Sequence, residues 1–99
     1  MTDKSEAAFT DQDVPVMAPT FRLQWEDAQD CYVILYPEGM VKLNPAAGEI
    51  LSRCDGHRTV GDIIEELVAS FPDADDLGSD VLDFLRTAHE HQWIQHKPA

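Results

Sequence analysis

The chain has 99 residues, of which 43% are hydrophobic, which is enough for one domain with a modest core. Its formal net charge is -12 at pH 7, with 7 basic residues against 19 acidic ones. Proteins that bind nucleic acids neutralise phosphates with Lys and Arg, so this balance disfavours binding to DNA or RNA and, by the same repulsion, to anionic membranes.

Residues 1 to 19 are acidic, contain prolines, and show no sustained period of 2 or 3.6. This pattern predicts a flexible N-terminal tail, of which residues 14 to 17 could dock on the domain. No basic segment followed by an apolar run opens the chain, and the apolar residues 32 to 36 are too few to cross a bilayer. We therefore expect a cytoplasmic protein.

Three short strands are predicted next. Residues 21 to 25 alternate between apolar and polar side chains, and residues 31 to 36 are mainly β-branched and aromatic. A turn at residues 37 to 39 leads into residues 40 to 43, which alternate again. We expect a small antiparallel meander whose last strand has a free edge, because the sequence offers no later strand to pair with it.

Three helices are predicted after the strands. Asn44 and Pro45 begin the first helix, since Asn caps exposed amides and Pro is preorganised at the first helical position. Thr59 and Asp62 form a capping box at the start of the second helix. The third runs from about residue 77 to residue 92, and its apolar face is wider than one core contact requires. Three strands followed by three helices indicate an α+β domain.

Side chains capable of chemistry occur in patterns that do not favour catalysis or metal binding. Cys31 and Cys54 match no metal or redox motif, so we expect two reduced thiols. Cys54 lies near His57, but it belongs to an apolar stripe and no orienting acid is identified. His89 and His91 diverge on a helix and cannot share a metal as an i, i+4 pair would. We expect no cofactor and no enzyme activity.

A long acidic stretch lies between Arg58 and Arg86, which are separated by eight acidic residues and no basic one. Two interpretations remain open. The stretch is a solvated helix face, which is the commoner role of such a charge run, or it is a docking surface for a basic partner protein.

Residues 23 to 72, together with DVLDFLRTAHEHQWI at residues 80 to 94, resemble the PqqD family of pyrroloquinoline quinone biosynthesis. The resemblance covers about residues 18 to 94. Its most specific pieces are YPEGMVKLN, the CDG turn between two helices, and the final Trp93-Ile94. It implies a winged helix-turn-helix-like fold called a RiPP recognition element, with residues 20 to 95 as the domain and residues 96 to 99 as a C-terminal tail.

The resemblance also implies partners. Members of the family bind the precursor peptide PqqA and present it to PqqE, a radical S-adenosylmethionine enzyme that cross-links a Glu and a Tyr of the peptide. The peptide adds as a strand beside the third strand and lies against the third helix. The corresponding residues here are Met40, Val41, Lys42, Leu43, Leu82, Leu85, Arg86 and His89.

Basic residues are scarce in the chain, so Lys42 and Arg86 are expected to pair with acidic side chains of the peptide. We expect a monomer or a weak homodimer. Three alternatives remain: a recognition element of another modified-peptide pathway, an acidic winged-helix regulator, and a small enzyme.

Overall fold

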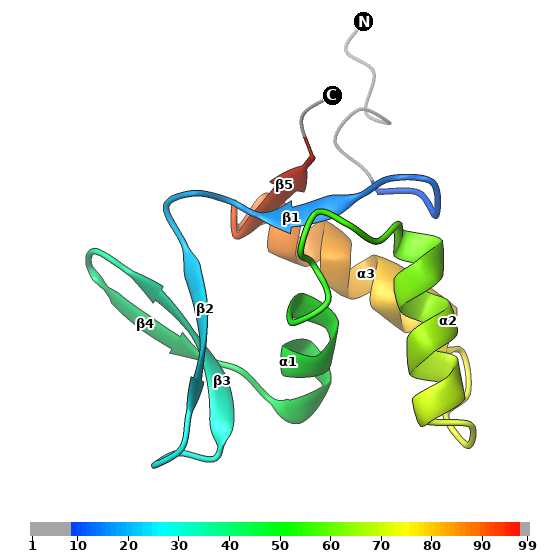
Figure 1. The fold of residues 1–99 in the computed structure, drawn as a ribbon, viewed down its shortest axis with the longest axis horizontal. Helices are drawn as coiled ribbons and strands as arrows, with labels where there is room; N and C mark the ends of the chain where they lie inside the picture. The colour runs from blue at the N-terminus through cyan, green and yellow to red at the C-terminus, as the bar shows by residue number, and fades with distance from the viewer. Residues whose placement is uncertain (1–8, 98–99) are drawn as a thin grey trace, which may run out of the picture.

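The computed structural model describes residues 9 to 97, and Figure 1 shows their arrangement. Three antiparallel strands are followed by three helices, as expected, and two further strands lie near the ends of the chain. The elements are β1 (Pro15–Met17), β2 (Arg22–Glu26), β3 (Cys31–Tyr36), β4 (Gly39–Lys42), α1 (Pro45–Leu51), α2 (Val60–Ser70), α3 (Leu77–Glu90) and β5 (Ile94–His96). No helix within residues 9 to 97 has the length and apolar content needed to span a membrane.

The predicted meander is the sheet β2-β3-β4. Its register aligns Leu23 of β2, Ile34 of β3 and Val41 of β4 in one row. Paired residues of neighbouring strands point to the same face, so this row forms an apolar face. Ile34 is fully buried in the core, and Leu23 and Val41 pack against the core from either side.

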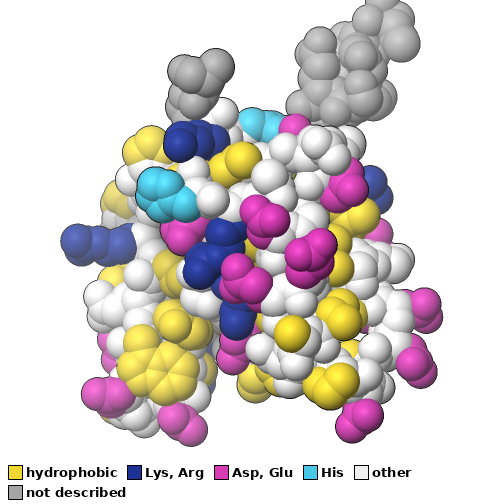
Figure 2. Space-filling view, turned by 45° about the vertical axis from the view of Figure 1, so that its right-hand side comes forward, with side chains coloured by type: hydrophobic (Ala, Val, Ile, Leu, Met, Phe, Trp, Pro, Cys, Tyr) yellow, Lys and Arg dark blue, Asp and Glu magenta, His cyan; other side chains and the backbone are white. Residues whose placement is uncertain are grey.

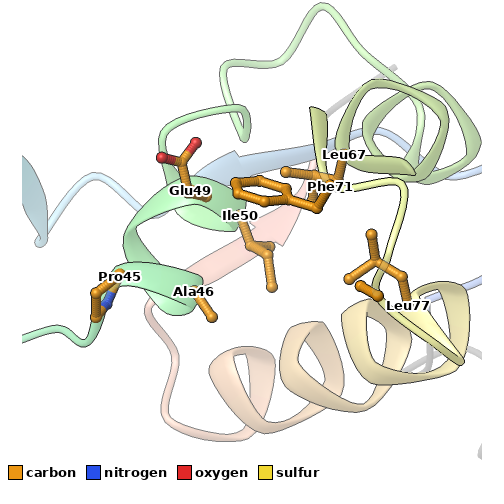
Figure 3. Close-up of a pocket in the computed structure, with 8 residues that line it drawn as sticks. Pro45, Ala46, Glu49, Ile50, Leu67, Phe71 and Leu77 are labelled. Atoms are coloured by element: carbon orange, nitrogen blue, oxygen red, sulfur yellow. The ribbon is translucent and has the colours of Figure 1, made fainter. Parts of the chain in front are cut away.

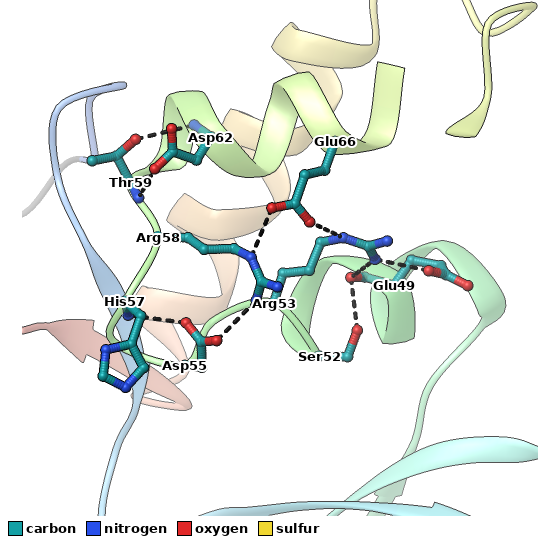
Figure 4. Close-up of polar contacts among 9 residues, drawn as sticks. All are labelled: Glu49, Ser52, Arg53, Asp55, His57, Arg58, Thr59, Asp62 and Glu66. Carbon is teal, nitrogen blue, oxygen red and sulfur yellow. Dashed lines mark hydrogen bonds and ion pairs between the residues drawn. The ribbon is translucent and has the colours of Figure 1, made fainter. Parts of the chain in front are cut away.

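Both predicted helix starts are confirmed. The Asn44 side chain accepts a hydrogen bond from the Ala47 amide at 2.8 Å, and Pro45 is the first residue of α1. The Thr59 hydroxyl accepts from the Asp62 amide at 3.0 Å, while the Asp62 carboxylate accepts from the Thr59 amide at 3.1 Å (Figure 4). These bonds satisfy amides that an uncapped helix would leave without a partner.

The core lies between the sheet and the three helices. Along α3, Val81, Leu85 and Ala88 are fully buried, while Leu82 and Phe84 are partly buried beside them, which confirms the predicted wide apolar face. The buried side chains of the other two helices include Ala47, Ile50, Leu51, Val60, Ile63 and Leu67. One continuous cluster therefore joins all three helices to the sheet.

The N-terminal segment docks on the domain at residues 15 to 17, as the sequence allowed, but the ordered part extends further than the expected flexible tail permits. β1 pairs antiparallel with β5, with Pro15 opposite His96 and Met17 opposite Ile94. Phe9 is fully buried and belongs to the hydrophobic core. Residues 9 to 19 are therefore part of the domain, and His96 lies in a strand rather than in the C-terminal tail. The rest of the expected N-terminal tail, residues 1 to 8, lies outside the described residues.

Backbone hydrogen bonds explain why the N-terminal segment packs here. The carbonyl oxygen of Asp13 accepts from the Val60 amide at 2.8 Å, and that of Asp11 accepts from the Gly61 amide at 3.0 Å. These amides belong to the first turn of α2 and have no partner within the helix. A Cβ on Gly61 would lie 3.2 Å from the Asp11 oxygen, so the absence of a side chain permits this close approach. The segment thus completes the cap of α2.

Candidate functional site

The edge of β4 presents unpaired backbone groups. In the described part of the chain β4 pairs with β3 alone, in an order that leaves its other edge open. The Leu43 amide donates to the Tyr32 carbonyl at 3.0 Å. Antiparallel strands alternate between residues that bond their partner strand and residues that point away. The amides and carbonyls of Met40 and Lys42 therefore face outward, where another strand can bind them.

The side chains of β4 divide between the surface and the core. Met40 is 48% exposed, Lys42 is exposed and Val41 is half-buried, whereas Leu43 is 7% exposed and belongs to the core. Met40, Val41 and Lys42 can thus touch a bound peptide. Leu43 supports the strand from beneath.

The candidate residues on α3 are similarly divided. Leu85 is fully buried, so its contribution is to the shape of the helix face. Leu82 is half-buried against the core cluster. The Arg86 side chain is 48% exposed, and its Nη1 lies 3.9 Å from the nearest carboxylate oxygen, on Asp83. That separation leaves Arg86 able to bind a second acidic group.

His89 takes part in an aromatic cluster that the sequence pattern does not predict. Its ring meets the rings of Phe9 and His96 edge to face, at centroid distances of 5.2 Å and 5.3 Å. Phe9 and His96 themselves stack at 4.1 Å. In the sequence, Phe9 is an isolated aromatic residue in a polar segment, and this pattern does not indicate which residues it contacts. His89 therefore packs against the N-terminal segment and β5, and helps to hold them in place.

A hollow of about 330 Å³ lies beside His89, between the end of α3 and the linker from β1 to β2. Phe21, in that linker, also contacts the ring of Tyr36 at the end of β3, with centroids 5.7 Å apart. Gly39, the first residue of β4, pairs with Tyr36. Phe21 therefore lies both at the hollow beside the end of α3 and against the turn that leads into β4. Within residues 9 to 97, no group of three or more His, Cys, Asp or Glu side chains is arranged to hold a metal.

Two other basic residues are engaged in ion pairs. Glu66 of α2 accepts from Arg53 at 3.1 Å and from Arg58 at 2.7 Å, so that it bridges the turn after α1 (Figure 4). Arg53 also binds Glu49 at 2.8 Å, and this hydrogen bond is the largest cause of its raised pKa. These pairs position the segment between α1 and α2. They leave Lys42 and Arg86 as basic groups better placed to bind a ligand.

Asp55, in the same turn, accepts a hydrogen bond from the His57 amide at 2.9 Å. Its carboxylate also forms an ion pair with Arg58 at 2.8 Å. The backbone hydrogen bond is the largest cause of the lowered pKa of Asp55. Since folding favours its ionised form, the resulting stability is present above the ordinary pKa of 3.8 and is lost as pH falls through the lowered value.

Cys54 is buried, and its Sγ lies 3.4 Å from the Ile50 carbonyl oxygen. Burial, with a smaller contribution from the Asp55 carboxylate, raises the pKa of Cys54 to about 12. A thiol of this kind is protonated near neutral pH and is a poor nucleophile. This environment disfavours the alternative of a cysteine enzyme.

We expect Cys54 to resist alkylation by iodoacetamide in the folded protein at about pH 8, while the half-buried Cys31 reacts faster. Mass spectrometry of the labelled peptides measures both rates, and labelling in urea gives the unprotected rate for each thiol. Equal labelling of Cys54 in the folded and unfolded protein would contradict its burial.

Comparison with known proteins identifies the family. The family model for coenzyme PQQ synthesis protein D (PqqD) matches residues 31 to 94. A protein of Azotobacter vinelandii named PqqA binding protein is 49% identical over 83 residues, which cover 84% of this chain and 90% of that protein. A protein of the same name from Acinetobacter baylyi is 54% identical over 80 residues, 81% of each chain.

A solved structure agrees with these sequence relationships. It is the solution NMR structure of the PqqD part of Methylobacterium extorquens PqqCD, described as a functional, stand-alone RiPP recognition element. It is 28% identical to this chain, with a TM-score of 0.73 over 92% of this chain and 98% of that one. From its sequence and its fold, the chain belongs to the PqqD family.

Proposed function

We propose that this protein captures the precursor peptide PqqA by adding it as a strand to β4, and presents it to the radical S-adenosylmethionine enzyme PqqE. The open edge of β4 is the observation that carries the proposal, since the outward backbone groups of Met40 and Lys42 can bind a strand of any sequence. The names of the curated relatives support PqqA as the peptide.

Side chains of β4 and α3 would select the peptide. Met40, Val41 and Leu82 offer apolar contacts, and Lys42, Arg86 and His89 offer polar ones. Leu43 and Leu85 act from within the core by fixing the positions of β4 and α3. In strand addition, main-chain hydrogen bonds supply affinity and alternate side-chain contacts supply specificity.

Charge reversal tests this assignment. We expect Lys42→Glu and Arg86→Glu each to weaken the binding of synthetic PqqA about fivefold or more, because each removes an attraction to acidic peptide side chains and adds a repulsion. Lys97→Glu is the control, since it changes the net charge equally on an exposed residue beyond β5. Isothermal titration calorimetry measures the affinities. Equal effects at all three positions would show that only net charge matters.

Presentation is tested with the enzyme. PqqE should cross-link PqqA faster when this protein is present, and Lys42→Glu should reduce that gain. If the protein binds PqqA but leaves the rate of cross-linking unchanged, capture without presentation is the better description. Failure to bind PqqA at all would favour a recognition element of another peptide pathway.

A further inference from the structure

A second surface, separate from β4, contains an apolar groove of about 410 Å³. It lies between α1, the end of α2 and the start of α3, as Figure 3 shows. Phe71 reaches from the end of α2 toward Ile50 of α1, and Leu77 lies across from them. The lining residues are Pro45, Ala46, Glu49, Ile50, Leu67, Phe71, Ala74 and Leu77.

The groove is apolar in spite of Glu49, because the Glu49 carboxylate points away from the apolar side chains (Figure 3) and pairs with Arg53 at 2.8 Å. Apolar surface also extends beyond the groove. Phe71 is 46% exposed, and Val68, one turn earlier on α2, is 48% exposed. An apolar hollow bordered by exposed large side chains is typical of a protein interaction site.

The surroundings of the groove are acidic. Asp73, Asp75 and Asp76 are exposed and flank two of its lining residues, Ala74 and Leu77. Figure 2 brings this side of the molecule forward and shows acidic side chains scattered among exposed hydrophobic ones. Glu66 is neutralised by two arginines, but the acids of the loop between α2 and α3 have no ion pair among the described residues. The charge therefore complements a basic partner.

We propose that this groove docks the enzyme that modifies the captured peptide, through an apolar anchor of that enzyme flanked by Lys or Arg. This inference rests on the proposed function. It adds the location of the second interface, which shares no residue with the peptide surface of β4 and α3. Peptide and enzyme can then bind at the same time, as presentation requires.

Phe71→Glu places a charge in the groove and tests the proposal. We expect the affinity for purified PqqE to fall at least about tenfold, because interface anchors of this type dominate binding, while the affinity for PqqA stays within about twofold. Trp25→Glu is the matched control: Trp25 is 47% exposed but lies on β2, outside the groove. Circular dichroism verifies the fold, and Val68→Glu replaces Phe71→Glu if the latter does not fold.

Neutralising the acidic side chains of the loop between α2 and α3 tests the proposal independently. Asp73→Asn, Asp75→Asn and Asp76→Asn together should weaken PqqE binding and reduce its salt dependence, since they remove long-range attraction. The affinity for PqqE is measured in the absence of peptide. A loss of PqqE binding can therefore be distinguished from a loss of PqqA binding. Unchanged PqqE affinity in both the groove and the loop variants would overturn the proposal. Loss of PqqA affinity instead of PqqE affinity would assign the groove to the peptide and would also overturn it.

Discussion

Replacement of Phe9 by Ala is expected to lower the free energy of unfolding by about 3 kcal/mol. Phe9 has no exposed surface and packs in the core cluster against the rings of His89 and His96. Truncation removes these contacts and leaves a cavity that the neighbours fill only in part. A small domain has a total stability of roughly 5 to 15 kcal/mol, so this loss is large. Urea denaturation followed by tryptophan fluorescence measures it.

Phe71→Ala is the matched control, because Phe71 is the same residue type but is 46% exposed. We expect it to cost about 1 kcal/mol or less. If Phe9→Ala were no more destabilising than Phe71→Ala, residues 9 to 14 would not be an integral part of the domain. The assignment of this segment to the core would then fail.

A proline at Met40 is expected to weaken PqqA binding about tenfold or more. Proline removes the amide hydrogen that points to the open edge of β4, and its ring occupies the path of the incoming strand. The loss of one hydrogen bond alone accounts for about 1 kcal/mol. The bonds between β4 and β3 are kept, because they come from the neighbouring residues. Calorimetry with synthetic PqqA measures the effect.

Met40→Ala separates the backbone from the side chain. It keeps the amide and removes the 48% exposed side chain, so we expect a loss of affinity of only a few-fold. Strand addition predicts that Met40→Pro is clearly the weaker binder of the two. If both variants bind equally, side-chain contacts rather than backbone bonds hold the peptide.

Much of the fold could be predicted because its signals are local. Asn44-Pro45 and the Thr59-Asp62 box act on amides within one helical turn, and the structure forms both caps. The alternation of residues 21 to 25 and the turn after Tyr36 define a meander from neighbouring residues alone. α1 ends at Leu51, and beyond it the Arg53 and Cys54 amides bond carbonyls three residues back and tighten the last turn.

The ends of the chain could not be predicted in the same way. β1 and β5 have three residues each and are joined only in the folded protein, since they lie at opposite ends of the sequence. Neither strand carries a pattern strong enough to identify its partner. The burial of Phe9 against His89 depends on the pairing of β1 with β5, so this burial could not be predicted from the sequence either. In the candidate site, the open edge of β4 could be predicted from the order of the elements along the chain. The burial of Leu85 could be established only from the three-dimensional structure.

Amide hydrogen exchange by NMR distinguishes strand addition on β4 from other modes of PqqA binding. In the protein alone, the outward amides of Met40 and Lys42 should exchange quickly, whereas the Leu43 amide is protected by Tyr32. Saturation with PqqA should slow exchange at Met40 and Lys42 and leave Leu43 nearly unchanged. If PqqA binds but the exchange of the Met40 and Lys42 amides stays fast, the peptide does not add to β4 as a strand.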